Sequence, residues 1–152
     1  MDVYKAKIQS DGSLEKLKLR IVVRGYLQNK EMFGDTWSPK TSMSTLKYFL
    51  ADAAKHKARV HPLDFIGTFL QSNVKNRVFV ILNMRYAAYF PEYSQYFGRA
   101  LKLFKSMYGM IKSVKLFADE LTEWLIEESF MQSQCHMSIY YKYAPGGSKC
   151  FV

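Results

Sequence analysis

The order of hydrophobic and polar residues along this chain predicts strands and helices in turn. Residues 3–28 hold two strand-like runs around a Ser-Asp-Gly turn, which predicts a β-hairpin. Over residues 42–57 the apolar positions follow helical spacing, with Ser42 or Ser44 as the N-cap. A second helical stripe, over residues 113–129, carries five carboxylates on its opposite face.

Shorter apolar runs predict further strands. One is "VHPLDF", residues 60–65, where Pro62 suits the start of a strand better than its centre. A loop is expected over residues 29–40, and an irregular, aromatic-rich surface excursion over residues 86–98. Further strands are expected at 77–83, 99–110, 129–134, 138–144 and 149–152. Strands and helices in this order indicate an α/β or α+β domain, and we expect α+β.

The composition is that of a folded protein without a membrane span. The chain has 152 residues, enough for one domain, and 49% of them are hydrophobic, which excludes disorder. It has no apolar run of about 20 residues and no apolar signal-peptide core. Cys135 and Cys150 lack the spacing of a zinc site. We therefore expect reduced thiols in an intracellular protein of cytoplasm or nucleus, with a disulfide between the two cysteines as the alternative.

The charge is basic and unevenly distributed. The chain has 22 lysine and arginine residues against 13 aspartate and glutamate residues, a net charge of +9. From Lys40 to Lys115 there are thirteen basic residues and three acidic ones, whereas five acids crowd residues 119–128. This pattern favours a polyanion-binding surface on one side of the molecule. A generic soluble basic domain is the alternative, and charge alone does not decide between the two.

Several short segments, in order, resemble the motifs of one polymerase family. The stretch "SDGSLEKLKLRIVVRGYLQ" is similar to K-x-R-L-V-A-R-G-x-x-Q, and "DTWSPK" to T-F-S-P-V. The stretch "LDFIGTFL" resembles D-V-x-x-A-F-L, and "KLFKSMYGMIKSVKLFADEL" resembles K-L-x-K-A-L-Y-G-L-K-Q-x-P-R-x-W. The stretch "FMQSQCHMSIYYK" lies where that family has a strand pair. The family is the reverse transcriptase of copia-type (pseudoviral) LTR retrotransposons, and the resemblance covers nearly the whole chain.

The resemblance implies one partial polymerase domain whose C-terminal part is missing. Residues from 1 to about 60 would be fingers-like, and residues 61–152 would form palm and fingers. The expected partners are an RNA or DNA template–primer and deoxynucleoside triphosphates, and no membrane is expected among them. The complete enzyme would be an RNA-directed DNA polymerase, that is, a nucleotidyltransferase.

Asp64, the single carboxylate of an apolar run, matches the family's first catalytic aspartate. Nucleotidyl transfer uses two magnesium ions, and magnesium takes one or two carboxylates together with substrate phosphates. The resemblance therefore implies that Asp64 binds metal, with the backbone carbonyl of Phe65 as a second ligand. An aspartate that faces water at a strand end or helix cap is the alternative.

Five residues are candidates for nucleotide binding. The resemblance places Phe69 where a bulky aromatic ring would exclude a 2′-hydroxyl, although an ordinary core phenylalanine is the alternative. Lys18, Arg20 and Arg24 alternate with apolar residues on the hairpin and would clamp a triphosphate, or else form a solvated strand face. Lys112 stands at the family's nucleotide-approaching glutamine. The aromatic stretch 86–97 would either stack on bases or, as we expect, serve packing.

The departures from the family are as informative as the matches. The Y-x-D-D hairpin that supplies the other carboxylates would follow Val152, and no two aspartates are adjacent in the 152 residues. One carboxylate cannot hold two magnesium ions, so we expect the chain to be inactive alone. A non-catalytic nucleic-acid-binding remnant and a non-functional pseudogene product are the alternatives. Other replaced motif positions are Thr68, Ile111, Lys112, Val114, Lys115, Phe117, His136 and Met137.

Overall fold

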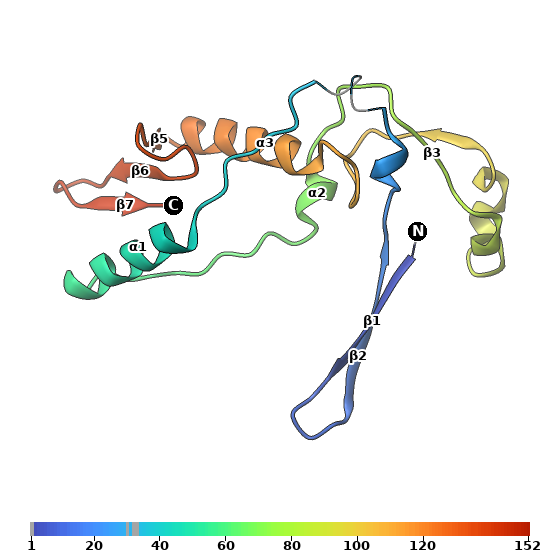
Figure 1. Cartoon of the computed structure of the whole chain (residues 1–152), viewed down its shortest axis with the longest axis horizontal. Coiled ribbons are helices and arrows are strands. Elements are labelled where there is room, and N and C mark those ends of the chain that lie inside the picture. The colour runs from blue at the N-terminus through green and yellow to red at the C-terminus, as the bar shows by residue number, and fades with distance from the viewer. Residues whose placement is uncertain (1, 30, 32–33) are drawn as a thin grey trace. The chain divides into compact units, whose positions relative to one another are not determined.

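The chain is a mixed α and β protein, as expected from its sequence. A computed structural model describes residues 2–29, 31 and 34–152 (Figure 1). The residues divide into two compact units: unit 1 comprises Met1–Thr36 and Gly67–Phe117, and unit 2 comprises Trp37–Ile66 and Ala118–Val152. The predicted fingers and palm regions meet at a single boundary near residue 60, whereas each of these units combines two separate stretches of chain. The fingers and palm assignment therefore stays a prediction. In the described part of the chain, no helix has the length and apolarity needed to cross a membrane.

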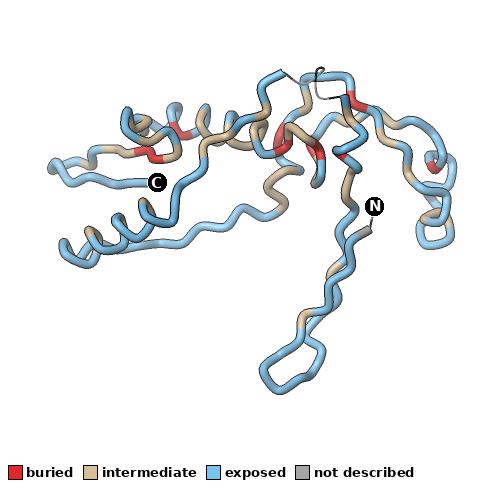
Figure 2. The backbone as a smooth tube through the Cα atoms, in the orientation of Figure 1, coloured by how far each residue is buried: buried red, intermediate tan, exposed pale blue. Residues whose placement is uncertain are grey.

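The predicted hairpin is confirmed as β1 (Asp2–Ile8) and β2 (Leu14–Ile21), which form an antiparallel two-stranded sheet in unit 1. The turn is closed by Asp11, whose carboxylate accepts hydrogen bonds from the Ser13 hydroxyl (2.7 Å) and the Ser13 N–H (2.9 Å). The bond from the Ser13 hydroxyl has the larger effect, and together the two bonds lower the pKa of the Asp11 carboxyl below its ordinary value. Gly12 has φ +85°, which a glycine adopts without strain. Residues 3–8 and 14–21 of the hairpin are all exposed or half-buried (Figure 2).

The remaining strands of unit 1 form a second antiparallel pair, β3 (Phe79–Ile81) with β4 (Ala100–Lys102). Backbone bonds from Leu103 to Val78 (2.9 Å) and from Val74 to Phe104 (2.9 Å) continue the pairing beyond the strands. Val78 and Met110 form a small core here, which is completed by half-buried neighbours. These neighbours are Val23, Val74, Leu103 and Met107.

The aromatic stretch between β3 and β4 contains two 3₁₀ helices, η3 (Met84–Ala88) and η4 (Pro91–Tyr96). Phe97, which follows η4, is buried and lies 6.2 Å from the Tyr86 ring, centroid to centroid. The ring of Tyr89, by contrast, is exposed. The stretch is therefore irregular, as predicted, and part of it serves packing.

In unit 2, helix α1 (Met43–Lys55) begins at Ser42, whose hydroxyl accepts the N–H of Thr45 at 3.1 Å. This confirms one of the two predicted N-caps. The predicted strands near the C-terminus form a three-stranded sheet, β5-β6-β7. Phe49 of α1 packs on Phe151 of β7 with the ring centroids 5.2 Å apart. The strands are β5 (Met131–Gln132), β6 (Tyr140–Tyr143) and β7 (Lys149–Phe151).

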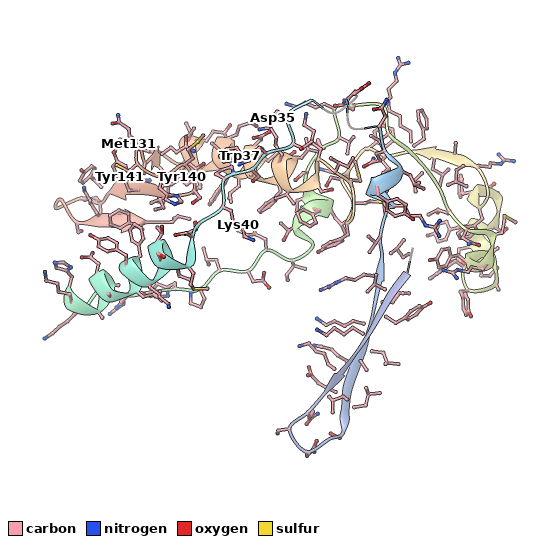
Figure 3. The ribbon with its side chains drawn as sticks, viewed as in Figure 1. Asp35, Trp37, Lys40, Met131, Tyr140 and Tyr141 are labelled. Atoms are coloured by element: carbon pink, nitrogen blue, oxygen red, sulfur yellow. The ribbon has the colours of Figure 1, made fainter. Side chains whose placement is uncertain are left out.

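The second predicted helix is α3 (Ser113–Glu127), whose residues from Ala118 onward belong to unit 2. Leu125 is buried as expected, but Trp124 is half exposed, so the apolar stripe is narrower than its sequence indicates. Tyr140 anchors the adjoining sheet because its hydroxyl bonds Thr122 (2.6 Å) and Gln132 (3.0 Å). Figure 3 labels Tyr140, together with Met131, which pairs with Tyr141 across β5 and β6.

The strand predicted at residues 60–65 was wrong. This segment is exposed throughout, has no regular structure, and pairs with no described strand. Pro62 lacks an N–H, and Val60, the one β-branched residue of this run, has neither a ladder partner nor a buried face on which to pack. A short helix, α2 (Thr68–Gln71), follows it and was not predicted. The expected loop over 29–40 is confirmed for residues 34–40, while residues 30, 32 and 33 lie outside the described residues.

Both cysteines, Cys135 and Cys150, are exposed free thiols. The alternative prediction, a disulfide between these two cysteines, is therefore wrong for this structure.

Candidate nucleotide-binding site

In unit 1, the chain that follows β2, from Val22 to Gly25, passes very close to the turn at Tyr108 and Gly109. We call this segment the base of the hairpin. The N–H of Val23 donates to the Tyr108 carbonyl at 2.8 Å. A Cβ atom at Gly109 would overlap the Val23 carbonyl oxygen and a methyl group of Val22, and one at Gly25 would overlap the Gly109 carbonyl oxygen. Two glycines that face each other therefore allow main chain to meet main chain here.

A side-chain contact joins the same two segments: the side-chain carbonyl of Gln28 accepts the N–H of Ile111 at 3.0 Å. Within the second segment, the Ser113 hydroxyl donates to the Met107 carbonyl at 2.6 Å. Lys115 lies 3.5 Å from the carboxylate of Asp35, which Figure 3 labels. Residues from three segments that resemble separate family motifs thus contact one another within unit 1.

The ring of Tyr108 brings two of the predicted nucleotide-binding residues together. The Arg20 guanidinium carbon lies 6.0 Å from the Tyr108 ring centroid, within range of a cation–π interaction. Phe69 meets the same ring edge to face, with centroids 5.0 Å apart and an interplanar angle of 74°. Arg20 is exposed and Phe69 is half-buried. An arginine and an aromatic ring from different segments therefore both contact one tyrosine.

Sequence reasoning missed Tyr108. The signal was present, because an aromatic residue precedes a turn glycine in "MYGM", within a motif of the family resemblance. The motif predicted a role for Lys112 instead, four positions further on, because it replaces a glutamine of the family. Lys112 is half-buried just before α3, where its carbonyl accepts the N–H of Leu116 at 2.9 Å.

The other two cationic candidates lie on different kinds of backbone. Lys18 is half-buried on β2, directly opposite Lys5 of β1. Arg24 is exposed and lies beyond the end of β2, at the N-cap of η1 (Gly25–Leu27) with φ −79° and ψ 75°. The alternation predicted to include Arg24 was therefore wrong, because the strand ends at Ile21 before the chain turns toward Gly25.

Asp64 and Phe65 belong to unit 2 and lie on the exposed segment that replaces the predicted strand. Asp64 is exposed and lies at neither a strand end nor a helix cap, and both interpretations of its role stay predictions. In the described part of the chain, no three His, Cys, Asp or Glu side chains form a cluster able to hold a metal. One exposed carboxylate and one carbonyl do not fit two octahedral magnesium ions.

The whole chain, residues 1–152, matches the model of the family described as reverse transcriptase (RNA-dependent DNA polymerase). The chain belongs to this reverse transcriptase family. The resemblance to the copia-type enzymes is confirmed by the curated relatives, and no solved structure matches this reverse transcriptase chain.

Three of the relatives are polyproteins of plant transposons. The chain is 28% identical over 143 residues to the "Retrovirus-related Pol polyprotein from transposon TNT 1-94" of Nicotiana tabacum, with 91% of this chain and 10% of the relative covered. It is 25% and 26% identical over 140 residues to the corresponding polyproteins from transposons RE2 and RE1 of Arabidopsis thaliana, with 91% of this chain and 9% of each relative covered. The reverse transcriptase chain thus spans about a tenth of the length of these relatives.

Proposed function

We propose that this chain forms the incoming-nucleotide side of an RNA-directed DNA polymerase and contributes Asp64 to its metal site. The observation that carries the proposal is the match of the whole chain to the reverse transcriptase family. The meeting of Arg20, Tyr108 and Phe69 gives this proposal a physical site. Template–primer and deoxynucleoside triphosphates are the proposed partners.

The proposed site pairs a cation with an aromatic wall. The exposed guanidinium of Arg20 is oriented by the Tyr108 ring, and a guanidinium binds phosphate oxygens through two parallel hydrogen bonds. Phe69 packs edge to face on the same Tyr108 ring, and this contact restricts the movement of the Phe69 ring. A ring fixed in this way would press on the sugar of a bound nucleotide and exclude a 2′-hydroxyl.

The metal ligands of the proposed polymerase are incomplete in the described residues. Asp64 supplies one carboxylate, and among the described residues no three His, Cys, Asp or Glu side chains form a cluster that could hold a metal. We therefore expect the 152-residue chain to incorporate no deoxynucleotide by itself, and its role in polymerisation depends on carboxylates supplied from elsewhere.

A chimeric polymerase tests the proposal. This chain replaces the matching segment in the polyprotein of the tobacco transposon relative, and incorporation of dTTP is measured on a poly(rA)·oligo(dT) template–primer. We expect incorporation by the chimera, and a loss of at least about 100-fold with Asp64→Asn, because a metal ligand stabilises the transition state by several kcal/mol. Phe69→Ala is expected to raise incorporation of ribonucleotides relative to deoxynucleotides.

Glu128→Gln is the matched control, since it neutralises an exposed carboxylate at the end of α3. It should leave incorporation unchanged. The proposal fails if the Asp64→Asn chimera is as active as its parent, or if a chimera with native circular dichroism extends no primer. In the second case, binding of nucleic acid without catalysis is the function that remains.

A further inference from the structure

Among the described residues of unit 1, three serines are buried, and their hydroxyls differ in how they are paired. Ser113, 1% exposed, donates its hydroxyl to the Met107 carbonyl at 2.6 Å. Ser72 and Ser106 are both 0% exposed, and in the described part of the chain neither hydroxyl has a hydrogen-bond partner. Most buried polar side-chain atoms in folded proteins are hydrogen-bonded, so these two hydroxyls are exceptions that require a physical reason.

The two unpartnered hydroxyls lie next to each other, and we call Ser72 and Ser106 the serine pair. Asn73 and Lys105 form an isolated antiparallel bridge, and the Ser106 N–H donates to the Ser72 carbonyl at 2.8 Å. Ser72 is therefore directly opposite Ser106, where Cβ atoms are about 5 Å apart. Side chains alternate along extended chain, so the exposed Asn73 and Lys105 point away from the buried serine pair.

The serine pair joins the two segments that carry the aromatic rings of the proposed nucleotide site. Ser72 is the C-cap of α2, which contains Phe69, and Ser106 precedes Tyr108 by two residues. The Phe69 and Tyr108 rings meet edge to face with their centroids 5.0 Å apart. Separation of the two segments at the serine pair would therefore also move Phe69 away from Tyr108.

The serine pair lowers the free energy needed for this separation. A buried hydroxyl without a partner has lost its hydrogen bonds to water, and it regains them when the two segments part. Local opening is therefore easier here than at a pairing whose polar groups are all hydrogen-bonded. At the other end of α2, Gly67 has φ +63°, and a Cβ atom there would meet only the Leu70 side chain within 4 Å. Small residues at the end of an element are common hinge positions.

We propose that Ser72 and Ser106 are positioning residues of the nucleotide site, and that opening at the serine pair moves the Phe69 ring aside while a deoxynucleotide enters or leaves. Both serine side chains are fully buried, so they act through Phe69 and not by contact with the nucleotide. The inference rests on the function proposed above for this site. It adds that the ring that would exclude a 2′-hydroxyl when closed is a gate that opens together with α2.

Amide exchange of the 152-residue chain measures the opening. The reporter is the Val74 N–H, which donates to the Phe104 carbonyl at 2.9 Å beside the serine pair. Ser72→Ala and Ser106→Ala should each slow its exchange by about 5- to 100-fold, the range that corresponds to one unsatisfied buried polar group. The two effects should multiply in the double variant, because each substitution removes a separate unpaired hydroxyl.

Ser113→Ala is the matched control, since it also removes the hydroxyl of a buried serine in unit 1. This hydroxyl has a partner, and its removal leaves the Met107 carbonyl without that donor. Exchange of the Val74 amide should therefore become faster or stay unchanged in Ser113→Ala. Slower exchange in this control would mean that the loss of any buried hydroxyl stabilises unit 1, and it would overturn the inference.

Hydroxyls that are paired in solution would give a different pattern. If the two serines of the pair bonded each other, each single substitution would leave one hydroxyl unpaired and speed exchange, while the double variant would be nearly neutral. If a buried water molecule bridged the two hydroxyls, the single and double variants would all exchange faster. Either pattern overturns the inference.

The gate is tested in the chimeric polymerase bound to a dideoxy-terminated primer, on which dTTP binds without incorporation. Stopped-flow fluorescence of 2-aminopurine, placed in the template beside the templating adenine, measures both binding rates. In the Ser72→Ala, Ser106→Ala variant, dTTP should associate and dissociate more slowly by a factor similar to that found for the Val74 amide, with Kd unchanged. A gate alters passage in both directions and leaves the bound state as it is, whereas a merely stabilising substitution would change neither rate.

The two measurements fail in different ways. Unchanged dTTP rates in a double variant with slower Val74 exchange would overturn the role of the serine pair and leave the proposed function standing. A chimera that extends no primer would contradict the proposed function and, with it, the role of the serine pair at the nucleotide site. The exchange measurement needs no polymerisation, so it separates a serine pair that does not open from a chain that does not polymerise.

Discussion

Gly109 and Gly12 adopt nearly the same backbone conformation, with φ of +86° and +85°, in opposite surroundings. A Cβ atom at Gly12 would meet nothing within 4 Å, whereas one at Gly109 would overlap the main chain at Val23. Alanine at either position has the strain of a left-handed conformation, about 1–2 kcal/mol. Only Gly109→Ala must also displace main chain, which adds about 1–3 kcal/mol.

We therefore expect Gly109→Ala to destabilise unit 1 clearly more than Gly12→Ala does. The measurement is hydrogen exchange at the Val23 amide, which donates to the Tyr108 carbonyl. Its protection should fall strongly in Gly109→Ala and little in Gly12→Ala. Equal losses in the two variants would mean that backbone strain, and not the close crossing, is what these glycines relieve.

Residue types could be predicted from the sequence better than their neighbours could. Arg20 and Phe69 were identified as candidates from a strand pattern and a motif, and both do contact one aromatic ring. The ring itself, Tyr108, was missed because a contact between residues 88 positions apart, such as that of Tyr108 with Arg20, leaves no periodic signal in the chain. Lys112 was chosen by its place in a motif, which says nothing of which side chain the fold brings to Phe69.

At the scale of single elements, the N-terminus of α1 offers a matched pair of serines. The Ser42 hydroxyl accepts the Thr45 N–H, whereas Ser44 lies exposed inside the first turn. Ser42→Ala should cost about 1 kcal/mol because a helix N–H loses its acceptor. Ser44→Ala should be neutral or stabilising by up to about 0.5 kcal/mol, since alanine favours the helix interior. Urea unfolding followed by tryptophan fluorescence measures both, and an equal effect of the two would contradict the cap.

The elements that the sequence predicts well are those whose stability is local. Both helices and the β1–β2 hairpin have their own period, cap or turn, and the structure contains each of them. The strand predicted at 60–65 failed because a strand needs a neighbour, and an apolar run does not reveal one. Asp64 is therefore placed on an exposed segment, and its proposed role rests on the family and not on local structure.

At the scale of the whole molecule, the buried apolar residues fall into two separate sets. Unit 1 holds Val78, Phe97 and Met110, and unit 2 holds Leu125, Ile139 and Tyr140. Each set is small for a domain, and many large apolar side chains of both units are exposed. Two small cores give two sources of stability, so a single cooperative transition is not expected.

Both tryptophans, Trp37 and Trp124, belong to unit 2, so their fluorescence reports on that unit alone. We expect its urea midpoint to differ from the midpoint of unit 1, followed by exchange of the Val23 amide. A difference of 1 kcal/mol in stability separates the midpoints by about 0.3–1 M urea. Gly109→Ala should lower the unit 1 midpoint only, and Ser42→Ala the unit 2 midpoint only. If either substitution lowered both midpoints equally, the two cores would be one cooperative structure, because a change confined to one independent unit cannot alter the unfolding of the other.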